Sequence, residues 1–102
     1  NMDIEEAQDR TDALIQAQGL QEKPLLVYAK LVEGVNALGR VMKIKEDDDN
    51  SYNKKQRIKE ELSDVLFTIL AISKMAKIDL GTEFENKIEK DWDKCNGVYK
   101  TQ

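Results

Sequence analysis

Apolar residues recur every three or four positions along most of this chain, which is the spacing of one buried face on an α-helix. The pattern is clearest over residues 54–77, which carry two adjacent apolar stripes. The first stripe contains Ile58, Leu62, Val65, Ile69 and Ile72, and the second contains Leu66 and Leu70. A helix that is apolar on two flanks needs two packing partners, so we expect it to lie at the centre of an all-α fold.

Two further helices are predicted before it. The first begins at Asp3, whose carboxylate caps the helix at capping-box spacing from Glu6, and it ends at Gly19. Its sparse apolar positions predict packing at an edge of the fold. The second begins at Pro24, which suits a first helical turn, and ends near Lys45. Its predicted buried stripe consists of Leu31, Val35, Leu38 and Met42.

A fourth helix is predicted after residues 79–81, with Asn96 and Gly97 as its stop signal. Four residues share one of its faces and are interpreted as core positions. They are Phe84, Ile88, Trp92 and Cys95. Residues 46–53, EDDDNSYN, are polar without periodicity and predict a loop, in which the spacing of a calcium-binding EF-hand is not met. Short connections favour antiparallel neighbours, so we expect a four-helix, bundle-like arrangement.

Composition narrows the possible chemistry. The chain has 102 residues, of which 40% are hydrophobic and 35% charged, and this suits one domain over residues 1–102, with Asn1 interpreted as a cloning remnant. The absence of histidine removes histidine-based catalysis and imidazole zinc sites, and the single Cys95 allows no internal disulfide. We therefore expect a reducing, cytoplasmic location. No apolar run predicts a membrane span, and the net charge of -4 argues against DNA binding.

Glu61 and Asp64 form the one acidic pair on a strongly predicted helix, three residues apart on neighbouring surface. Both fall on the rim of the apolar stripe, where carboxylates can face a cleft and share a magnesium ion. On spacing alone, an ordinary solvated helix surface is the more common explanation of such a pair.

Three segments carry a more specific signal: KLVEGVNAL at residues 30–38, EELSDVL at residues 60–66, and KIDL at residues 77–80 followed by Phe84. Their order and spacing resemble the MazG-like all-α nucleoside triphosphate pyrophosphohydrolases. Those proteins carry approximately K-L-x-E-E-V-G-E-L, a loop, E-E-L-x-D-V-L and then a segment like G-I-D-L-x-x-x-F. The likeness covers most of the chain.

The resemblance implies magnesium-dependent hydrolysis of a nucleoside triphosphate to a monophosphate and pyrophosphate. In the family an ExxE pair and an ExxD pair hold the metal. The ExxD pair matches Glu61 and Asp64, but the two glutamates of the ExxE pair fall on Gly34 and Ala37. We therefore expect weakened activity, with a catalytically silent nucleotide-binding or protein-interaction module as the alternative.

The resemblance also suggests substrate contacts and self-association. Lys30, Lys90 and Lys94 are the candidate substrate-binding residues, although ordinary surface charge explains the last two more simply. Glu33 and Asn36 also lie three apart, but in the predicted register they point to solvent, opposite the apolar stripe. Two apolar flanks on a short chain, together with the resemblance, imply a dimer or tetramer.

Overall fold

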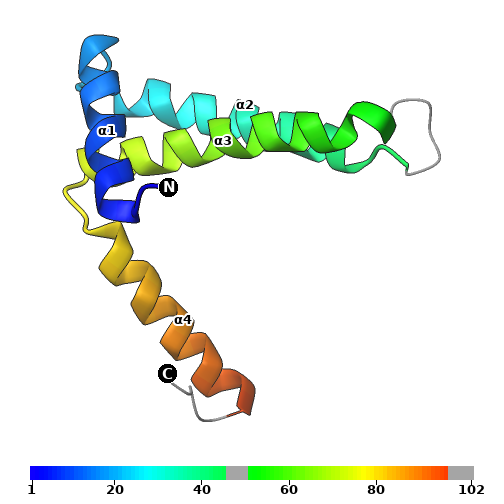
Figure 1. Ribbon diagram of the computed structural model, residues 1–102. Helices are drawn as coiled ribbons and strands as arrows, with labels where there is room; N and C mark the ends of the chain where they lie inside the picture. The colour runs from blue at the N-terminus through cyan, green and yellow to red at the C-terminus, as the bar shows by residue number, and fades with distance from the viewer. Residues whose placement is uncertain (46–50, 97–102) are drawn as a thin grey trace.

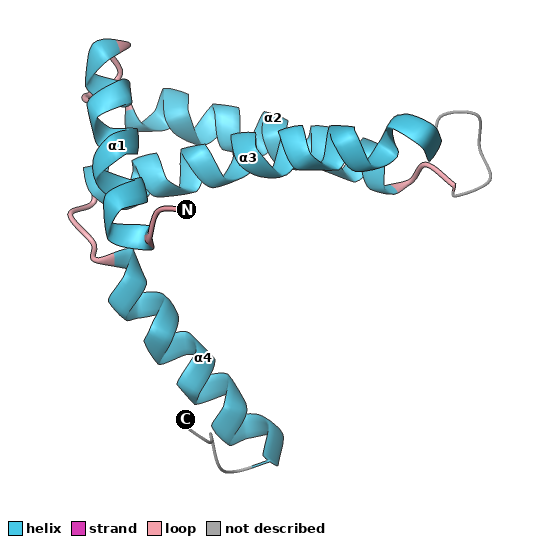
Figure 2. Cartoon of the chain, in the orientation of Figure 1, coloured by secondary structure: helices cyan, strands magenta, loops and turns pink. Residues whose placement is uncertain are grey.

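The computed structural model describes residues 1–45 and 51–96. These residues form four α-helices and no strand, which confirms the all-α, four-helix prediction. In chain order they are α1 (Ile4–Ala17), α2 (Pro24–Met42), α3 (Ser51–Met75) and α4 (Leu80–Asn96), as Figure 1 and Figure 2 show. Residues 46–50 of the predicted loop and the predicted stop residue Gly97 lie outside the described residues.

The antiparallel pair of α2 and α3 forms the long arm of the molecule (Figure 1). Two contacts fix how the helices are aligned along each other. Near the middle, Gly34 of α2 lies against Val65 of α3, so closely that a Cβ atom on Gly34 would be 3.1 Å from the Val65 side chain. Near the outer end, the Lys54 ammonium donates a hydrogen bond of 2.6 Å to the carbonyl of Ile44.

At the other end of the arm, α1 packs across α3 and closes a small core. Ile15, Val27 and Ala71 are each 1% exposed and bring α1, α2 and α3 together. Leu20, Phe67, Ile72 and Met75 pack against them. The buried face of α1 also includes the polar side chain of Gln8. This side chain donates hydrogen bonds to the Ser73 hydroxyl at 2.7 Å and to the Ile78 carbonyl at 2.9 Å, which satisfies its buried amide group.

The helix ends follow the predicted local chemistry. The Asp3 carboxylate accepts a hydrogen bond of 2.8 Å from the Glu6 amide, and Gly19 adopts a φ of +72° just after α1. Pro24 is the first residue of α2, which ends at Met42, three residues before the predicted end. Helix α3 begins at Ser51, three residues before its predicted start.

The prediction that α4 carries a core face is wrong within this chain. Phe84 and Trp92 are 51% and 50% exposed, and Cys95 is exposed as well. Helix α4 diverges from the arm and contacts α1 near its own start, where Gly81 lies close to Ile4 (Figure 1). Its apolar stripe is real, but the fold of one chain does not cover it.

The predicted buried stripe of α2 is also partly wrong. Val35 and Met42 are 50% and 56% exposed, whereas Val27 and Val41 are buried. The face of α2 that meets α3 is therefore rotated by about 50° from the predicted stripe. The reason is that α2 carries apolar residues on two flanks, only one of which faces α3. A stripe drawn from the spacing of all its apolar residues therefore lies between the two flanks. None of the described helices has the length and apolar character that a membrane crossing requires.

Candidate functional site

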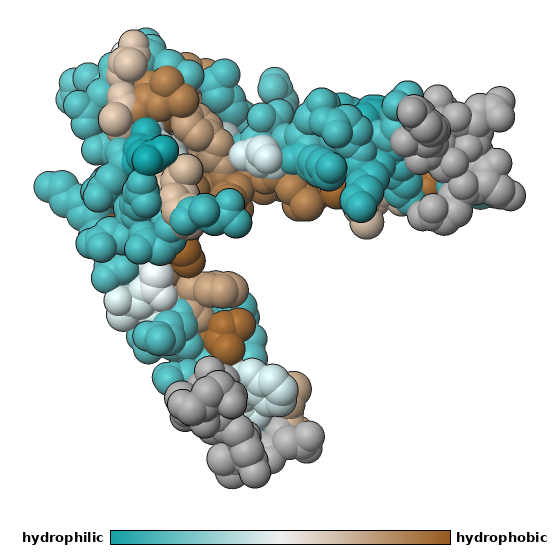
Figure 3. Space-filling model, in the orientation of Figure 1, coloured by the Kyte–Doolittle hydropathy of each residue, from teal (hydrophilic) through white to brown (hydrophobic). Residues whose placement is uncertain are grey.

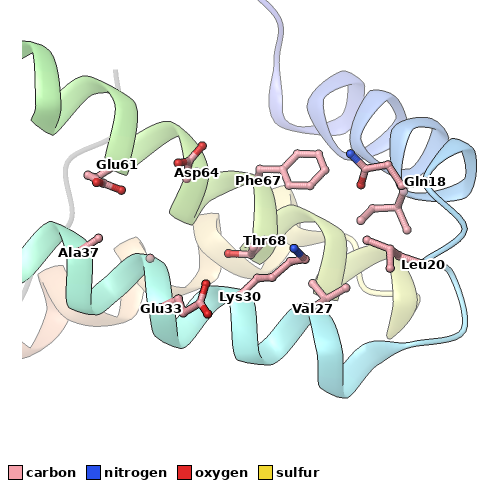
Figure 4. A pocket seen from close by; sticks show the side chains of 12 residues that line it. Gln18, Leu20, Val27, Lys30, Glu33, Ala37, Glu61, Asp64, Phe67 and Thr68 are labelled. Atoms are coloured by element: carbon pink, nitrogen blue, oxygen red, sulfur yellow. The ribbon is translucent and has the colours of Figure 1, made fainter.

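A groove of about 440 Å³ runs along one side of the α2–α3 pair and ends at α1 (Figure 4). Its lining comes from all three helices and from the turn after α1. The residues are Ile15, Gln18, Leu20, Val27, Lys30, Glu33, Gly34, Ala37, Glu61, Asp64, Phe67 and Thr68.

Helix α3 brings Glu61 and Asp64 to this groove, because residues three apart in an α-helix share one face. Glu61 is half-buried and Asp64 is exposed. In Figure 4 both carboxylates lie above the groove, across from Ala37 of α2, and Gly34 lines the same groove. Glu61 and Asp64 therefore line one cavity together with Gly34 and Ala37.

Gly34 is more than a groove residue, because it lies in the contact between the helices. The 3.1 Å spacing between its ideal Cβ position and Val65 Cγ2 is tighter than an ordinary van der Waals contact. A larger side chain at this position would require Val65 or the α2 backbone to move. The position where the resemblance expects a metal-binding glutamate is thus used here for close helix packing.

The model of the family described as MazG nucleotide pyrophosphohydrolase domain matches residues 4–101. The chain belongs to the MazG family. Searches of curated proteins and of solved structures each gave no significant match. The match spans all four helices, so the groove and its acidic motif are part of the MazG domain.

Glu33 is exposed, as the sequence predicts, but its position in the groove was not predicted. Its side chain is exposed, but it lines the groove of this MazG domain from α2 (Figure 4). The predicted buried stripe is rotated by about 50° from the face of α2 that meets α3. Glu33 therefore lies about 120° around the helix from that face and is not directly opposite it. Asn36 is exposed and is not among the groove residues.

The three candidate lysines separate in space. Lys30 lines the groove, and it forms no ion pair with any residue that the structure describes. Lys90 and Lys94 are exposed on α4, away from the groove. Lys30 is therefore the one candidate cation that a single MazG chain brings beside Glu61 and Asp64.

Six of the lining residues are not singled out in the sequence analysis: Ile15, Gln18, Leu20, Val27, Phe67 and Thr68. Phe67 and Thr68 follow the acidic motif by three and four residues, so helical periodicity alone puts them on the same side of α3 as Asp64. Gln18 and Leu20 lie in the turn after α1, and only the crossing of α1 over α3 brings them here.

The donor set from this chain is small. Within residues 1–45 and 51–96, no three acidic or cysteine side chains come close enough together to form a metal cage. Glu61 and Asp64 can supply two carboxylates. This number suits Mg²⁺, which commonly binds one or two protein carboxylates and completes its six oxygen ligands with water and substrate phosphates.

Proposed function

We propose that this MazG domain binds magnesium complexes of nucleoside triphosphates in the α2–α3 groove and hydrolyses them slowly to monophosphate and pyrophosphate. The observation that carries the proposal is the shared groove of Glu61, Asp64 and Lys30 in a chain of this family. Two carboxylates suit a hydrated cation, and the adjacent ammonium suits a phosphate oxygen.

Each groove residue has a role in this proposal. Glu61 and Asp64 would hold Mg²⁺, which when bound polarises phosphoryl oxygens and neutralises developing charge. Lys30, on the opposite helix, would bind and orient the phosphate chain. Glu33 adds a carboxylate to the α2 side of the groove and disfavours phosphate groups that arrive without a cation.

The expected activity is low because α2 supplies two fewer carboxylates at the family positions. Gly34 and Ala37 have no side-chain oxygen, so substrate phosphates and water must provide the remaining metal ligands. A metal held by fewer protein ligands is positioned less firmly, and positioning is a large part of phosphoryl-transfer catalysis.

The contact of Gly34 with Val65 favours a second candidate function, which is nucleotide binding without hydrolysis. Packing at this position stabilises the helix pair at the expense of a metal ligand. In that case the groove retains magnesium-nucleotide affinity, and pyrophosphate release is absent.

We also propose that the chain associates with a second copy of itself through the side of the arm opposite the groove. Three apolar residues of α2 lie about 60–140° around the helix from the side that contacts α3; they are Val32, Val35 and Met42. On α3 the corresponding residues lie about 40–100° around the helix, in the same rotational sense, from the side that contacts α2; they are Leu62, Leu66 and Ile69. Because the two helices are antiparallel, residues rotated in the same sense on each helix lie on the same side of the pair. The groove residues lie on the other side. All six side chains are 39–56% exposed, and Figure 3 shows apolar surface along the lower edge of the arm.

Nucleotide binding by titration calorimetry, with and without Mg²⁺, tests the groove assignment. We expect Glu61→Gln and Asp64→Asn each to lower magnesium-dependent affinity at least tenfold, because each removes half of the carboxylate pair. The matched control is Glu60→Gln, since Glu60 neighbours Glu61 but does not line the groove. Equal losses in all three variants, or none, would contradict the assignment.

A further inference from the structure

A second groove, the inner groove, has a volume of about 730 Å³ and lies in the angle between the arm and α4. Its lining is mostly apolar and comes from α1, α3 and the start of α4. The apolar residues include Ile4, Leu14, Leu66, Leu70, Leu80 and Phe84. Figure 3 shows apolar surface on both sides of this angle, along the lower edge of the arm and along the facing side of α4. Exposed apolar faces of α3 and α4 therefore border the same open space.

The apolar residues of these two helices are in register with each other. A short connection joins α3 to α4, so if the helices folded together antiparallel, residues at equal distances from the connection would lie opposite each other. Phe84 would stay beside Leu70, with which it already lines the inner groove. One turn further, Ile88 would meet Leu66. Phe84 and Leu66 are 51% and 53% exposed, so this closure would remove a large apolar surface from water.

The connection between the two helices is fixed on both sides of one peptide link. On the α3 side, the Ile78 amide donates a hydrogen bond to the Ser73 carbonyl, and the Ile78 carbonyl accepts one from Gln8, both at 2.9 Å. On the α4 side, the Asp79 carboxylate accepts hydrogen bonds from the Thr82 amide and hydroxyl. Backbone rotation between Ile78 and Asp79 therefore turns α4 as a rigid body and breaks neither set of bonds.

The packing of α4 against the rest of the chain is concentrated near this hinge. Gly81 lies close to Ile4 of α1, with 3.9 Å between its ideal Cβ position and the Ile4 side chain. At the far end of the helix, Trp92 is 50% exposed and Cys95 is exposed. A helix that packs mainly at one end can turn about that end without disturbing the core of α1, α2 and α3.

We propose that α4 is a hinged strap that folds back over the inner groove in the monomer, so that one chain closes into a four-helix bundle. Closure covers Leu66 and Ile69, which also belong to the surface that the proposed function assigns to self-association. The strap and a second copy therefore compete for the same side of α3, and this competition rests on the proposed self-association. The strap keeps the apolar surface of the monomer covered until a second copy displaces it.

The chain contains one cysteine, Cys95 near the end of α4, and this permits a direct cross-linking test. Lys59 lies about 24 Å along α3 from the hinge end of that helix. Cys95 lies about 23 Å along α4 from its own hinge end, so the two residues meet when the strap closes. A disulfide needs Cα atoms within about 7 Å of each other. We therefore expect Lys59→Cys to form an intramolecular disulfide with Cys95 at nanomolar concentration in oxidised glutathione, as identified by non-reducing electrophoresis and peptide mass spectrometry.

Arg57→Cys is the matched control. Arg57 is exposed like Lys59, but it lies about 160° further around α3, away from the inner groove. Its disulfide with Cys95 should form at least about tenfold more slowly than that of Lys59→Cys. Equal rates would show random collision of a loose helix and would overturn the strap. Disulfide-linked dimers, or no disulfide at all in Lys59→Cys, would overturn it as well.

Trp92 provides a second readout that needs no introduced cysteine, because it is the one tryptophan of the chain. Closure would bury its ring against α3, so acrylamide at nanomolar protein concentration should quench its fluorescence less in the wild type than in Leu66→Glu. The glutamate places a charge under the strap and favours the open form. Arg57→Glu introduces the same side chain away from the inner groove and should match the wild type. Equal quenching in all three chains would contradict closure.

The cross-linked chain also separates closure from self-association. Disulfide-linked Lys59→Cys should sediment as a monomer at micromolar concentration, and reduction of the disulfide should restore association. Linked chains that associate as well as reduced ones would overturn the competition. A wild-type chain that stays monomeric would overturn the competition together with the proposed self-association, and the disulfide result then decides on the strap alone.

Discussion

At the residue scale, Gly34 and Ala37 of α2 occupy the two positions where the resemblance to the family expects metal-binding glutamates. Ala37 is a groove residue facing Glu61, and a longer side chain there has open space to enter. Gly34 is different, because its missing Cβ allows α2 to approach Val65 of α3. A glutamate at position 34 and one at position 37 would therefore have different consequences for packing.

This difference predicts the stability of variants that introduce a glutamate at position 34 or position 37. Gly34→Glu should lower the free energy of unfolding by about 1–3 kcal/mol, because its Cβ overpacks Val65. Val65→Ala should lower the free energy of unfolding less in the Gly34→Glu background than in the wild type, because the smaller Ala side chain leaves room for the Cβ of the glutamate at position 34. A double-mutant cycle from urea unfolding measures this coupling. Additive effects of the two changes would show that Val65 does not limit the position, and Ala37→Glu serves as the control.

The groove residues differ in how well the sequence predicts their positions. Glu61 and Asp64 were predicted to share a rim because spacing along one helix is enough to relate them. The groove position of Glu33 was missed because apolar residues on two flanks of α2 shifted the apparent buried stripe. The groove position of Gln18 depends on a crossing between helices distant in sequence, which no local pattern contains.

At the scale of elements, α1 is held to α3 by polar contacts as well as by the apolar packing of Ile15. Gln8 is 4% exposed and bridges the Ser73 hydroxyl and the Ile78 carbonyl. Lys74 pairs with Asp9 at 3.0 Å, and this hydrogen bond raises the pKa of Lys74 above its ordinary value of 10.5. The sequence predicted this helix at an edge from its few apolar residues, whereas its real packing face combines Ile15 with Gln8 and Thr11.

The Gln8 contacts predict a specific loss of stability. Gln8→Ala should lower the free energy of unfolding by about 1–3 kcal/mol, because it removes a buried donor from two acceptors. Gln16→Ala is the control, since Gln16 is exposed and bonds only to Asp12 on the same helix, and it should change stability by less than about 0.5 kcal/mol. Thermal unfolding of both variants provides the comparison, and equal effects would argue against Gln8 as the link between α1 and α3.

The hydrogen bonds of Asp79, just before α4, predict that the stability of the fold depends on pH. Hydrogen bonds from the Thr82 hydroxyl, at 2.8 Å, and the Thr82 amide lower the pKa of Asp79 below its ordinary value of 3.8. A lowered folded-state pKa stabilises the fold above pH 3.8, and this stabilisation is lost as the pH falls through the folded-state value. Asp79→Asn should therefore be less stable than the wild type at pH 7, with a difference that shrinks below pH 3.8. Urea unfolding across pH checks this, and Thr82→Val should reduce the difference.

At the scale of the whole molecule, the two sides of the arm differ in chemistry. One side holds the groove with its charged residues, and the other exposes apolar side chains of α2 and α3. The all-α class and four helices were predictable from periodicity, but the divergence of α4 was not. Periodicity shows that a helix has an apolar face and does not show whether the same chain covers it.

The exposed apolar side predicts self-association that can be removed without unfolding. Leu66→Glu should convert the assembly to a monomer in analytical ultracentrifugation, because it places a charge in the proposed interface. Its circular dichroism should remain helical, since Leu66 is 53% exposed in one chain. Lys59→Glu on the exposed surface of the same helix is the charge control. A wild-type chain that sediments as a monomer at micromolar concentration would contradict the proposal.

We propose that Glu61 and Asp64 give this MazG domain magnesium-dependent nucleotide chemistry although positions 34 and 37 carry Gly and Ala. Pyrophosphate release from a panel of nucleoside triphosphates, with Mg²⁺ and with chelator, tests it most directly. We expect slow release from at least one nucleotide, and this release should require Mg²⁺ and fall at least tenfold in Glu61→Gln but not in Glu60→Gln. Release that is absent for every nucleotide, or equal in the wild type and Glu61→Gln, would contradict it.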